Sequence, residues 1–199
     1  MAVKACACPL GATIGDLVDL DCPEKFGQIG KIAFQITGNA FTDITDEAEW
    51  TTAIAASDAT KVQVTPILHA QESTPPEPVT VGGAGDNTVF DGTIEIVSEG
   101  IYQINFSLRN PSPAVLDALS LYQCEVSRLG IYMGGSDFIL SKSDSSAIPV
   151  TSFYVQSSPA LNGNTDANIA QIQIVLDAGW FSDSLVSNIP WKFTSLLNA

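Results

Sequence analysis

Residues 112–130, Ser-Pro-Ala-Val-Leu-Asp-Ala-Leu-Ser-Leu-Tyr-Gln-Cys-Glu-Val-Ser-Arg-Leu-Gly, have the pattern of a long amphipathic helix. Ser112 suits the N-cap, and Pro113 suits the first helical position, where a missing N–H removes no hydrogen bond. Gly130 suits a left-handed C-cap. Apolar side chains recur every three or four residues on one face: Val115, Leu119, Tyr122, Val126 and Leu129, widened by Leu116. We expect this helix to lie across one face of a sheet that the flanking segments build, with the rest of the chain packed around it.

Alternating apolar residues on both sides of this stretch predict strands. A shorter helix is predicted over residues 46–57, where Asp46 and Glu49 form a capping-box pattern and Trp50 and Ile54 fall on the buried side. Another short helix is predicted between Phe181 and Pro190, and residues 72–78 form a proline-rich hinge. Strands are predicted over residues 26–36, 61–66, 93–97, 101–108, 131–133, 138–140, 150–156 and 169–176. The predicted fold class is therefore α+β, a largely antiparallel sheet packed against one long helix and one short helix.

The first 36 residues differ from the rest because prolines and glycines interrupt them. We interpret residues 1–36 as an extended N-terminal arm with one strand, and residues 37–199 as a single α+β domain. In the arm, the residues expected to contact a neighbouring protein are Phe26, Ile29, Ile32 and Phe34. The alternative is that these residues complete the sheet of their own domain. An arm role predicts that a chain beginning near Gly38 still folds.

Charge is the most informative property of the composition. Eight Lys and Arg against 22 Asp and Glu give a formal net charge of −14. A protein that neutralises phosphates needs the opposite balance, so we expect no direct binding to nucleic acid or to anionic membranes. The sequence also contains no run of about 18 apolar residues and no apolar signal-peptide core, so we expect no membrane span and no secretion signal, with synthesis ending in the cytosol.

The residues that most often carry chemistry give weak signals here. Cys6, Cys8, Cys22 and Cys124 lack the paired spacing of a zinc site, and cytosolic thiols normally stay reduced. His69 is the only histidine, and no nucleophile elbow accompanies it. We therefore predict no catalytic residue, no metal centre and no cofactor, with His69 as a loop histidine.

Glycines and acids also fall short of a recognisable site. The run Gly82-Gly83-Ala84-Gly85 lacks the Gly-Lys-Ser/Thr ending of a phosphate-binding loop, and Asp86 places negative charge where phosphate would lie. The spacing of Asp43 and Asp46 matches no calcium loop, and neither does Asp144 with its neighbouring serines. Paired carboxylates for glycoside hydrolysis remain an open alternative, since any two of the 22 acids might meet in the fold.

Several stretches together resemble the small virion proteins encoded by tailed phages of Bacteroidota, including crAss-like phages. The resemblance begins at Cys22-Pro23-Glu24-Lys25-Phe26-Gly27-Gln28-Ile29-Gly30-Lys31-Ile32-Ala33-Phe34-Gln35 and spans nearly the whole chain. Its other parts are Trp50 with the alanine-rich helix, residues 61–66, the glycine-rich loop 82–88, residues 119–132, residues 148–150 and the aromatic tail. The chain departs from the family pattern at Ala84 and Asp86, where relatives are expected to read Gly-Gly-Gly-Asn-Glu-Thr.

This resemblance implies a structural protein of the virion and not an enzyme. The protein would be an auxiliary or decoration protein of the capsid, assembled in the bacterial cytoplasm and bound in many copies to other virion proteins such as the major capsid protein. One alternative is a head-fibre or fibre-anchor module that binds host glycans through Trp180, Phe181 and Trp191. A less favoured alternative is a cell-wall or capsule hydrolase, which would have to use His69 or paired carboxylates.

Overall fold

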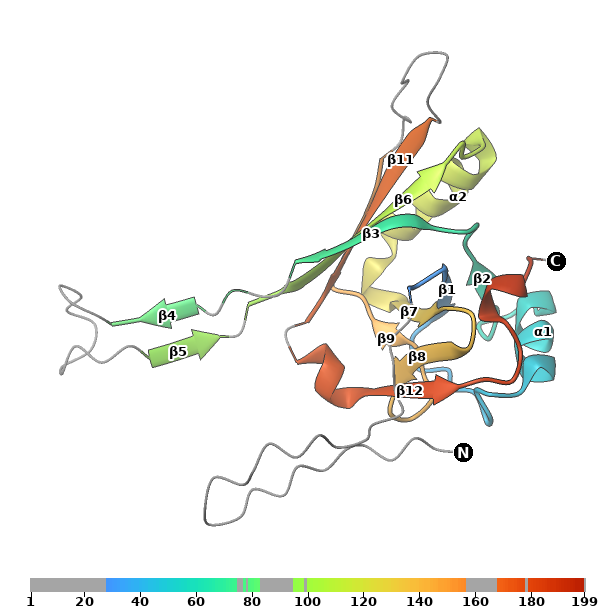
Figure 1. Cartoon of the computed structure of the whole chain (residues 1–199), viewed down its shortest axis with the longest axis horizontal. Coiled ribbons are helices and arrows are strands. Elements are labelled where there is room, and N and C mark those ends of the chain that lie inside the picture. Colours follow the sequence, from blue (N-terminus) through green and yellow to red (C-terminus); the bar gives the residue numbers. More distant parts are fainter. Residues whose placement is uncertain are drawn as a thin grey trace, which may run out of the picture.

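A computed structural model describes residues 28–74, 77, 79–82, 95–98, 100–156, 168–177 and 179–198. Within these residues the chain forms two antiparallel sheets that pack face to face, two α-helices and a separate two-stranded ribbon (Figure 1). The α+β class is confirmed. The sheets, and not a helix, form the centre of the structure.

The first sheet contains six strands in the order β12-β8-β7-β1-β2, with β9 also paired to β7. Its inner strands β1 and β7 pair along their full lengths, from Lys31 opposite Gly134 to Ile36 opposite Leu129. Every residue of β7 is buried, as is usual for a strand whose sheet is covered on both faces. The strands are β1 (Lys31–Ile36), β2 (Gln63–Val64), β7 (Leu129–Gly134), β8 (Phe138–Lys142), β9 (Ile148–Pro149) and β12 (Ser184–Asn188).

The second sheet contains four strands in the order β10-β11-β6-β3. Its central strand β6 alternates buried Ile104, Phe106 and Leu108 with more exposed polar residues, so one face lies in the core and the other faces solvent. The strands are β3 (His69–Thr74), β6 (Tyr102–Arg109), β10 (Ser152–Val155) and β11 (Ile169–Leu176).

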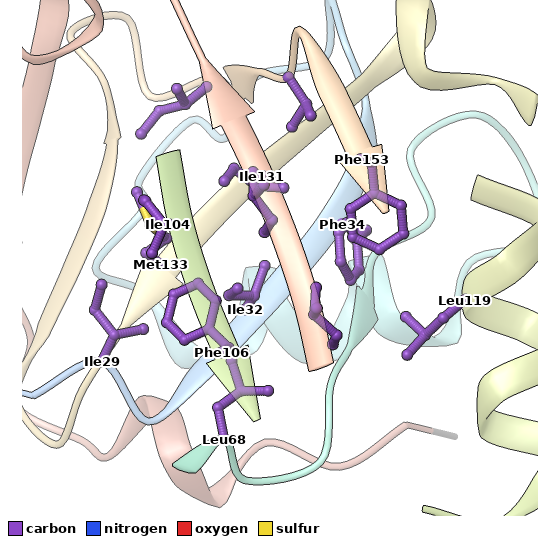
Figure 2. Close-up of a cluster of buried hydrophobic side chains, with 14 of the residues drawn as sticks. Ile29, Ile32, Phe34, Leu68, Ile104, Phe106, Leu119, Ile131, Met133 and Phe153 are labelled. Carbon is purple, nitrogen blue, oxygen red and sulfur yellow. The ribbon is translucent and has the colours of Figure 1, made fainter. Parts of the chain in front are cut away.

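The main core lies between the two sheets, as Figure 2 shows. Phe34 of the first sheet meets Phe153 of the second edge-on, with ring centroids 5.4 Å apart. Helix α2 (Pro113–Cys124) closes this side of the sandwich, because Leu119 points into the core beside these rings and Tyr122 lies 5.1 Å from Phe34. The amide of Gln123 also ties α2 to β10, donating to the Val155 carbonyl at 3.1 Å.

A second core covers the other face of the six-stranded sheet. Helix α1 (Glu47–Ala55) and the 3₁₀ helix η3 (Phe193–Ser195) lie there. Trp50 of α1 is fully buried, stacks on Phe41 at 4.4 Å and donates its indole N–H to the Ile44 carbonyl at 2.9 Å. Asp46 caps α1 as predicted. The reciprocal bond of a capping box is absent, because the Glu49 carboxylate instead accepts from the backbone N–H groups of residues 42 and 43.

The long helix is shorter than the sequence predicted. Ser112 and Pro113 begin α2 as expected, but α2 ends at Cys124 and is followed by the 3₁₀ helix η1 (Val126–Arg128). Gly130 is not a C-cap, since it lies within β7, where an added Cβ would come 2.5 Å from the Cβ of Ala147. This glycine therefore allows two backbones to approach closely.

Two other predictions were wrong for the same reason, which is pairing with distant strands. The helix expected before Pro190 is a 3₁₀ turn, η2 (Trp180–Asp183), followed by strand β12, which pairs with β8. The proline-rich hinge starts later than expected, because residues 69–74 form β3 and pair with β6. The remaining predicted strands coincide with observed ones to within a few residues.

The last residues of the predicted N-terminal arm form β1, an inner strand of the six-stranded sheet. Ile29, Ile32 and Phe34 are buried in the core between the sheets, so in this structure they complete their own sheet, the alternative noted above. Phe26 and the expected arm lie outside the described residues. Because β1 lies between β7 and β2, a chain beginning near Gly38 would lose an inner strand, and we now expect it not to fold.

Candidate interaction surfaces

Of the histidine and four cysteines considered for chemistry, the structure describes His69 and Cys124. His69 is half-buried at the start of β3, opposite Ser107 of β6, and not in a loop. Cys124 is exposed at the end of α2, and the other cysteines lie outside the described residues. In the described part of the chain, no three His, Cys, Asp or Glu residues gather closely enough to hold a metal ion. The same part contains no helix with the length and hydropathy to cross a membrane.

The acids singled out from the sequence are engaged in turns. Asp43 accepts hydrogen bonds from the hydroxyl and the backbone N–H of Thr45, which lower the pKa of this exposed carboxyl. Asp144 accepts in the same way from the hydroxyl and the N–H of Ser146, and the same kind of bond lowers the pKa of Asp144. Of the glycine-rich run, only Gly82 lies within the described residues, with φ of +93°. The carboxylates of Asp43 and Asp144 therefore stabilise the backbone of their own turns.

The ribbon of β4 (Val79–Val81) and β5 (Glu95–Ser98) is the first feature with the character of an interaction surface. Figure 1 shows it standing clear of the two-sheet body, beyond the ends of β3 and β6. Its strands pair only with each other in the described structure, with a register shift between Val79 and Thr80. Each strand therefore has one edge of backbone N–H and C=O groups that no other described strand pairs with.

The solvent-facing side of the four-stranded sheet is a second surface. One row across all four strands consists of Tyr154, Gln173, Asn105 and Glu72. The Asn105 side-chain carbonyl accepts hydrogen bonds from the amides of Gln103 at 3.2 Å and Gln173 at 3.4 Å. This face is polar and mostly uncharged, in contrast with the strongly acidic chain as a whole.

A cavity of about 300 Å³ beside Lys31, the Lys31 cavity, is a third feature. It lies between α2, the segment around strand β2 and the last described residues, and apolar groups make up most of its wall. Lys31 is only 4% exposed, and its ammonium donates to the Leu196 carbonyl. Burial lowers the pKa of Lys31. Beside the cavity, the Asn198 amide pairs with both backbone groups of Val64 at 2.7 Å, as a neighbouring strand would.

The aromatic residues considered for glycan stacking divide between core and surface. Trp191 packs near Trp50 in the second core and donates its indole N–H to the Thr45 carbonyl at 2.8 Å. Trp180 is half-buried against the ring of Tyr102. Phe181 alone of the three is largely exposed, at 53%. The three rings therefore do not form one exposed binding face.

Comparisons with known proteins add little to this geometry. No protein-family model matches the chain, and no curated protein matches it. A solved structure with some likeness is the cryo-EM structure of the anti-feeding prophage (AFP) baseplate, 6-fold symmetrised, at 10% sequence identity and a TM-score of 0.32. The alignment covers 78% of this chain and 97% of that chain. A likeness at this level establishes neither a shared fold nor a shared function.

The strand predicted over residues 93–97 corresponds to β5, but sequence reasoning missed β4, its pairing with β5 and the Lys31 cavity. The signal for the cavity is a lysine at the start of an otherwise apolar strand, Lys31-Ile32-Ala33-Phe34, since a lysine in an inner strand is seldom buried without a partner. The signal for the ribbon is the pair of short β-branched stretches, Val79-Thr80-Val81 and Ile96-Val97, on either side of the glycine-rich run.

Proposed function

We propose that this chain is a non-enzymatic structural protein of a phage particle, an auxiliary protein of the capsid that binds other virion proteins in many copies. The observation that carries the proposal is the β4–β5 ribbon, which stands clear of the body. A two-stranded ribbon is at best marginally stable alone in water, and its unpaired edges are suited to adding strands from another protein. The resemblance of the sequence to small phage virion proteins supports the same function.

The charge of the chain agrees with this function. A net charge of −14 keeps the protein soluble before assembly and disfavours contact with packaged nucleic acid. The partners would then be proteins, with the major capsid protein as the first candidate. In this proposal the ribbon makes the contact and the two-sheet body supports it.

The test removes the ribbon and leaves the body intact. Val79 pairs with Ser98, so replacing residues 80–97 by Asn-Gly closes the two strands with a two-residue hairpin. We expect the free energy of unfolding to change by less than about 0.5 kcal/mol, because no residue of the two cores is removed. We also expect the copy number in purified particles, measured by quantitative mass spectrometry, to fall at least about tenfold, the effect of losing about 1.4 kcal/mol of binding.

The matched control is Leu121→Ser, which changes an apolar residue that is 68% exposed. It belongs to α2, and Figure 1 shows α2 on the opposite side of the body from the ribbon. This variant should enter particles like the wild type. Normal incorporation of the folded ribbon-less protein would contradict the role of the ribbon. Absence of the wild-type chain from purified particles would contradict the function itself.

A further inference from the structure

Among the described residues, the buried ammonium of Lys31 has fewer partners than such a group needs. An ammonium has three N–H donors, and within the described structure the Leu196 carbonyl is its one hydrogen-bond acceptor. No described carboxylate forms a salt bridge with it, since the ion pair found in the described residues joins Lys142 and Asp183. A charge held in an apolar environment without a counter-charge is costly. The site therefore favours a ligand that brings a carboxylate.

The Lys31 cavity is lined mostly by apolar groups, so a ligand that fills it must also present apolar surface. Phe34, Leu119 and Tyr122 contribute to one side of the wall. Leu197 lines the cavity and yet is 79% exposed, and Ile67, which follows the lining residue Pro66 in the chain, is 54% exposed. A free carboxylate alone would leave this apolar surface uncovered, so the fitting ligand joins an acid to aliphatic side chains.

One stretch of this protein has that composition. Residues 16–21, which lie outside the described residues, read Asp-Leu-Val-Asp-Leu-Asp and alternate acids with Leu and Val. An acidic ligand from solution is repelled at long range by a chain of net charge −14. A ligand carried by an adjacent subunit overcomes this repulsion, because tethering gives effective concentrations in the millimolar range.

We propose that the Lys31 cavity binds residues 16–21 of a neighbouring copy of this chain, with an aspartate accepting hydrogen bonds from the Lys31 ammonium. The apolar side chains of the stretch cover the cavity wall and Leu197. This inference rests on the proposed function only for the supply of neighbouring copies.

The experiment measures binding of a peptide to the full-length protein by isothermal titration. The protein carries Asp16→Asn, Asp19→Asn and Asp21→Asn, so that its own stretch does not compete. The probe copies residues 14–21, acetylated and amidated so that its only carboxylates are the three aspartates. We expect binding at peptide concentrations up to about 1 mM, the range that tethering supplies.

Two changes test the ion pair. Lys31→Met in the protein should weaken peptide binding at least about tenfold, because one member of a buried charge pair is lost. Lys61→Met, which removes an exposed lysine two residues before β2, should leave binding unchanged. A peptide with asparagine at all three positions should also bind at least about tenfold more weakly, and this comparison does not depend on the folding of any protein variant.

Three results would overturn the proposal. They are no binding of the peptide up to about 1 mM, equal binding of the aspartate and asparagine peptides, or equal binding by Lys31→Met. Octanoate binding as tightly as the peptide would show instead that the cavity takes small carboxylates. None of these measurements uses a phage particle, so they can fail while the protein is still found in particles, and the reverse also holds.

Discussion

At the scale of single residues, the most informative side chains are polar groups in apolar surroundings. Trp50 and Lys31 are both almost fully buried, yet they are satisfied differently. The indole of Trp50 has a single N–H donor, and the Ile44 carbonyl accepts its hydrogen bond, so this polar group is satisfied within the fold. The ammonium of Lys31 has three N–H donors, and among the described residues one acceptor bonds to it, so two donors have no described partner. This contrast separates a structural residue from a candidate binding residue.

Because acidic side chains stabilise turns in this fold, we expect the free energy of unfolding to depend on pH. Hydrogen bonds from Ser146, first from its hydroxyl and then from its N–H, lower the pKa of Asp144 in the folded protein. A carboxyl whose folded pKa lies below its unfolded value stabilises the fold above the unfolded pKa, about 3.9, and loses this contribution as the pH falls through the folded pKa. Asp144→Ala should therefore lower the free energy of unfolding at pH 7, by about 1 kcal/mol or less because the group is exposed.

Urea denaturation of both proteins between pH 7 and pH 2.5 checks this prediction. The difference between wild type and Asp144→Ala should be constant above about pH 4 and shrink below it. The control Asp137→Ala removes the same charge from an exposed residue, and so reports the general effect of reducing the net charge. A difference that grows on acidification would show that the turn does not depend on the ionised carboxylate.

At the scale of elements, the 3₁₀ helix η3 packs closely against a glycine of the six-stranded sheet and a glycine just before strand β1. The ring of Phe193 in η3 lies on the backbone of Gly134, where an added Cβ would come 2.2 Å from the ring. Gly30 is similar, since its Cβ would come 2.5 Å from a methyl carbon of Thr194. Gly134 at the end of β7 and Gly30 just before β1 thus make room for η3, and Leu196 and Asn198, which follow η3, line the Lys31 cavity.

Gly134→Ala tests this packing. The added methyl group must displace the fully buried ring of Phe193, and we expect a loss of about 1–3 kcal/mol in the free energy of unfolding, typical of overpacking. Gly179→Ala is the control, because its nearest heavy atom would lie 3.9 Å away, and it should change stability by less than about 0.5 kcal/mol. Denaturant unfolding measures both, and a neutral Gly134→Ala would show that η3 can shift.

The sequence predicts elements where local chemistry decides them. Ser112 and Asp46 cap the two helices, and strands with clear alternation, such as residues 102–109, appear close to where the pattern places them. It fails where tertiary pairing decides. Leu129 continues the helical spacing of the preceding residues, but pairing of residues 129–134 with β1 ends the helix at Cys124. The strand at 184–188 likewise depends on β8, and a single sequence does not show that partner.

The candidate sites were less predictable than the fold. The sequence drew attention to His69 and several aspartates, which the structure places on a polar sheet face and in turns. Lys31 was not singled out, because its significance depends on burial and on the C-terminal residues 196–198, more than 160 residues away in the chain. Charge argued against nucleic acid and anionic membranes as partners, and the resemblance implied binding to other proteins, but neither identified the β4–β5 ribbon or the Lys31 cavity.

At the scale of the whole molecule, the body and the ribbon have different physical characters. The body has two cores that cover both faces of the six-stranded sheet. The ribbon has two strands whose outer edges no other described strand pairs with. A body with two cores that carries an unsupported ribbon fits the proposed function, in which neighbouring proteins supply the missing support.

In the proposed function the chain is part of a phage particle, and cryo-electron microscopy of purified particles tests this account most directly. The account predicts density for the two-sheet body at many symmetry-related positions, with the β4–β5 ribbon in contact with another virion protein. Particles that lack the chain, or that contain it with the ribbon facing only solvent, would contradict the account.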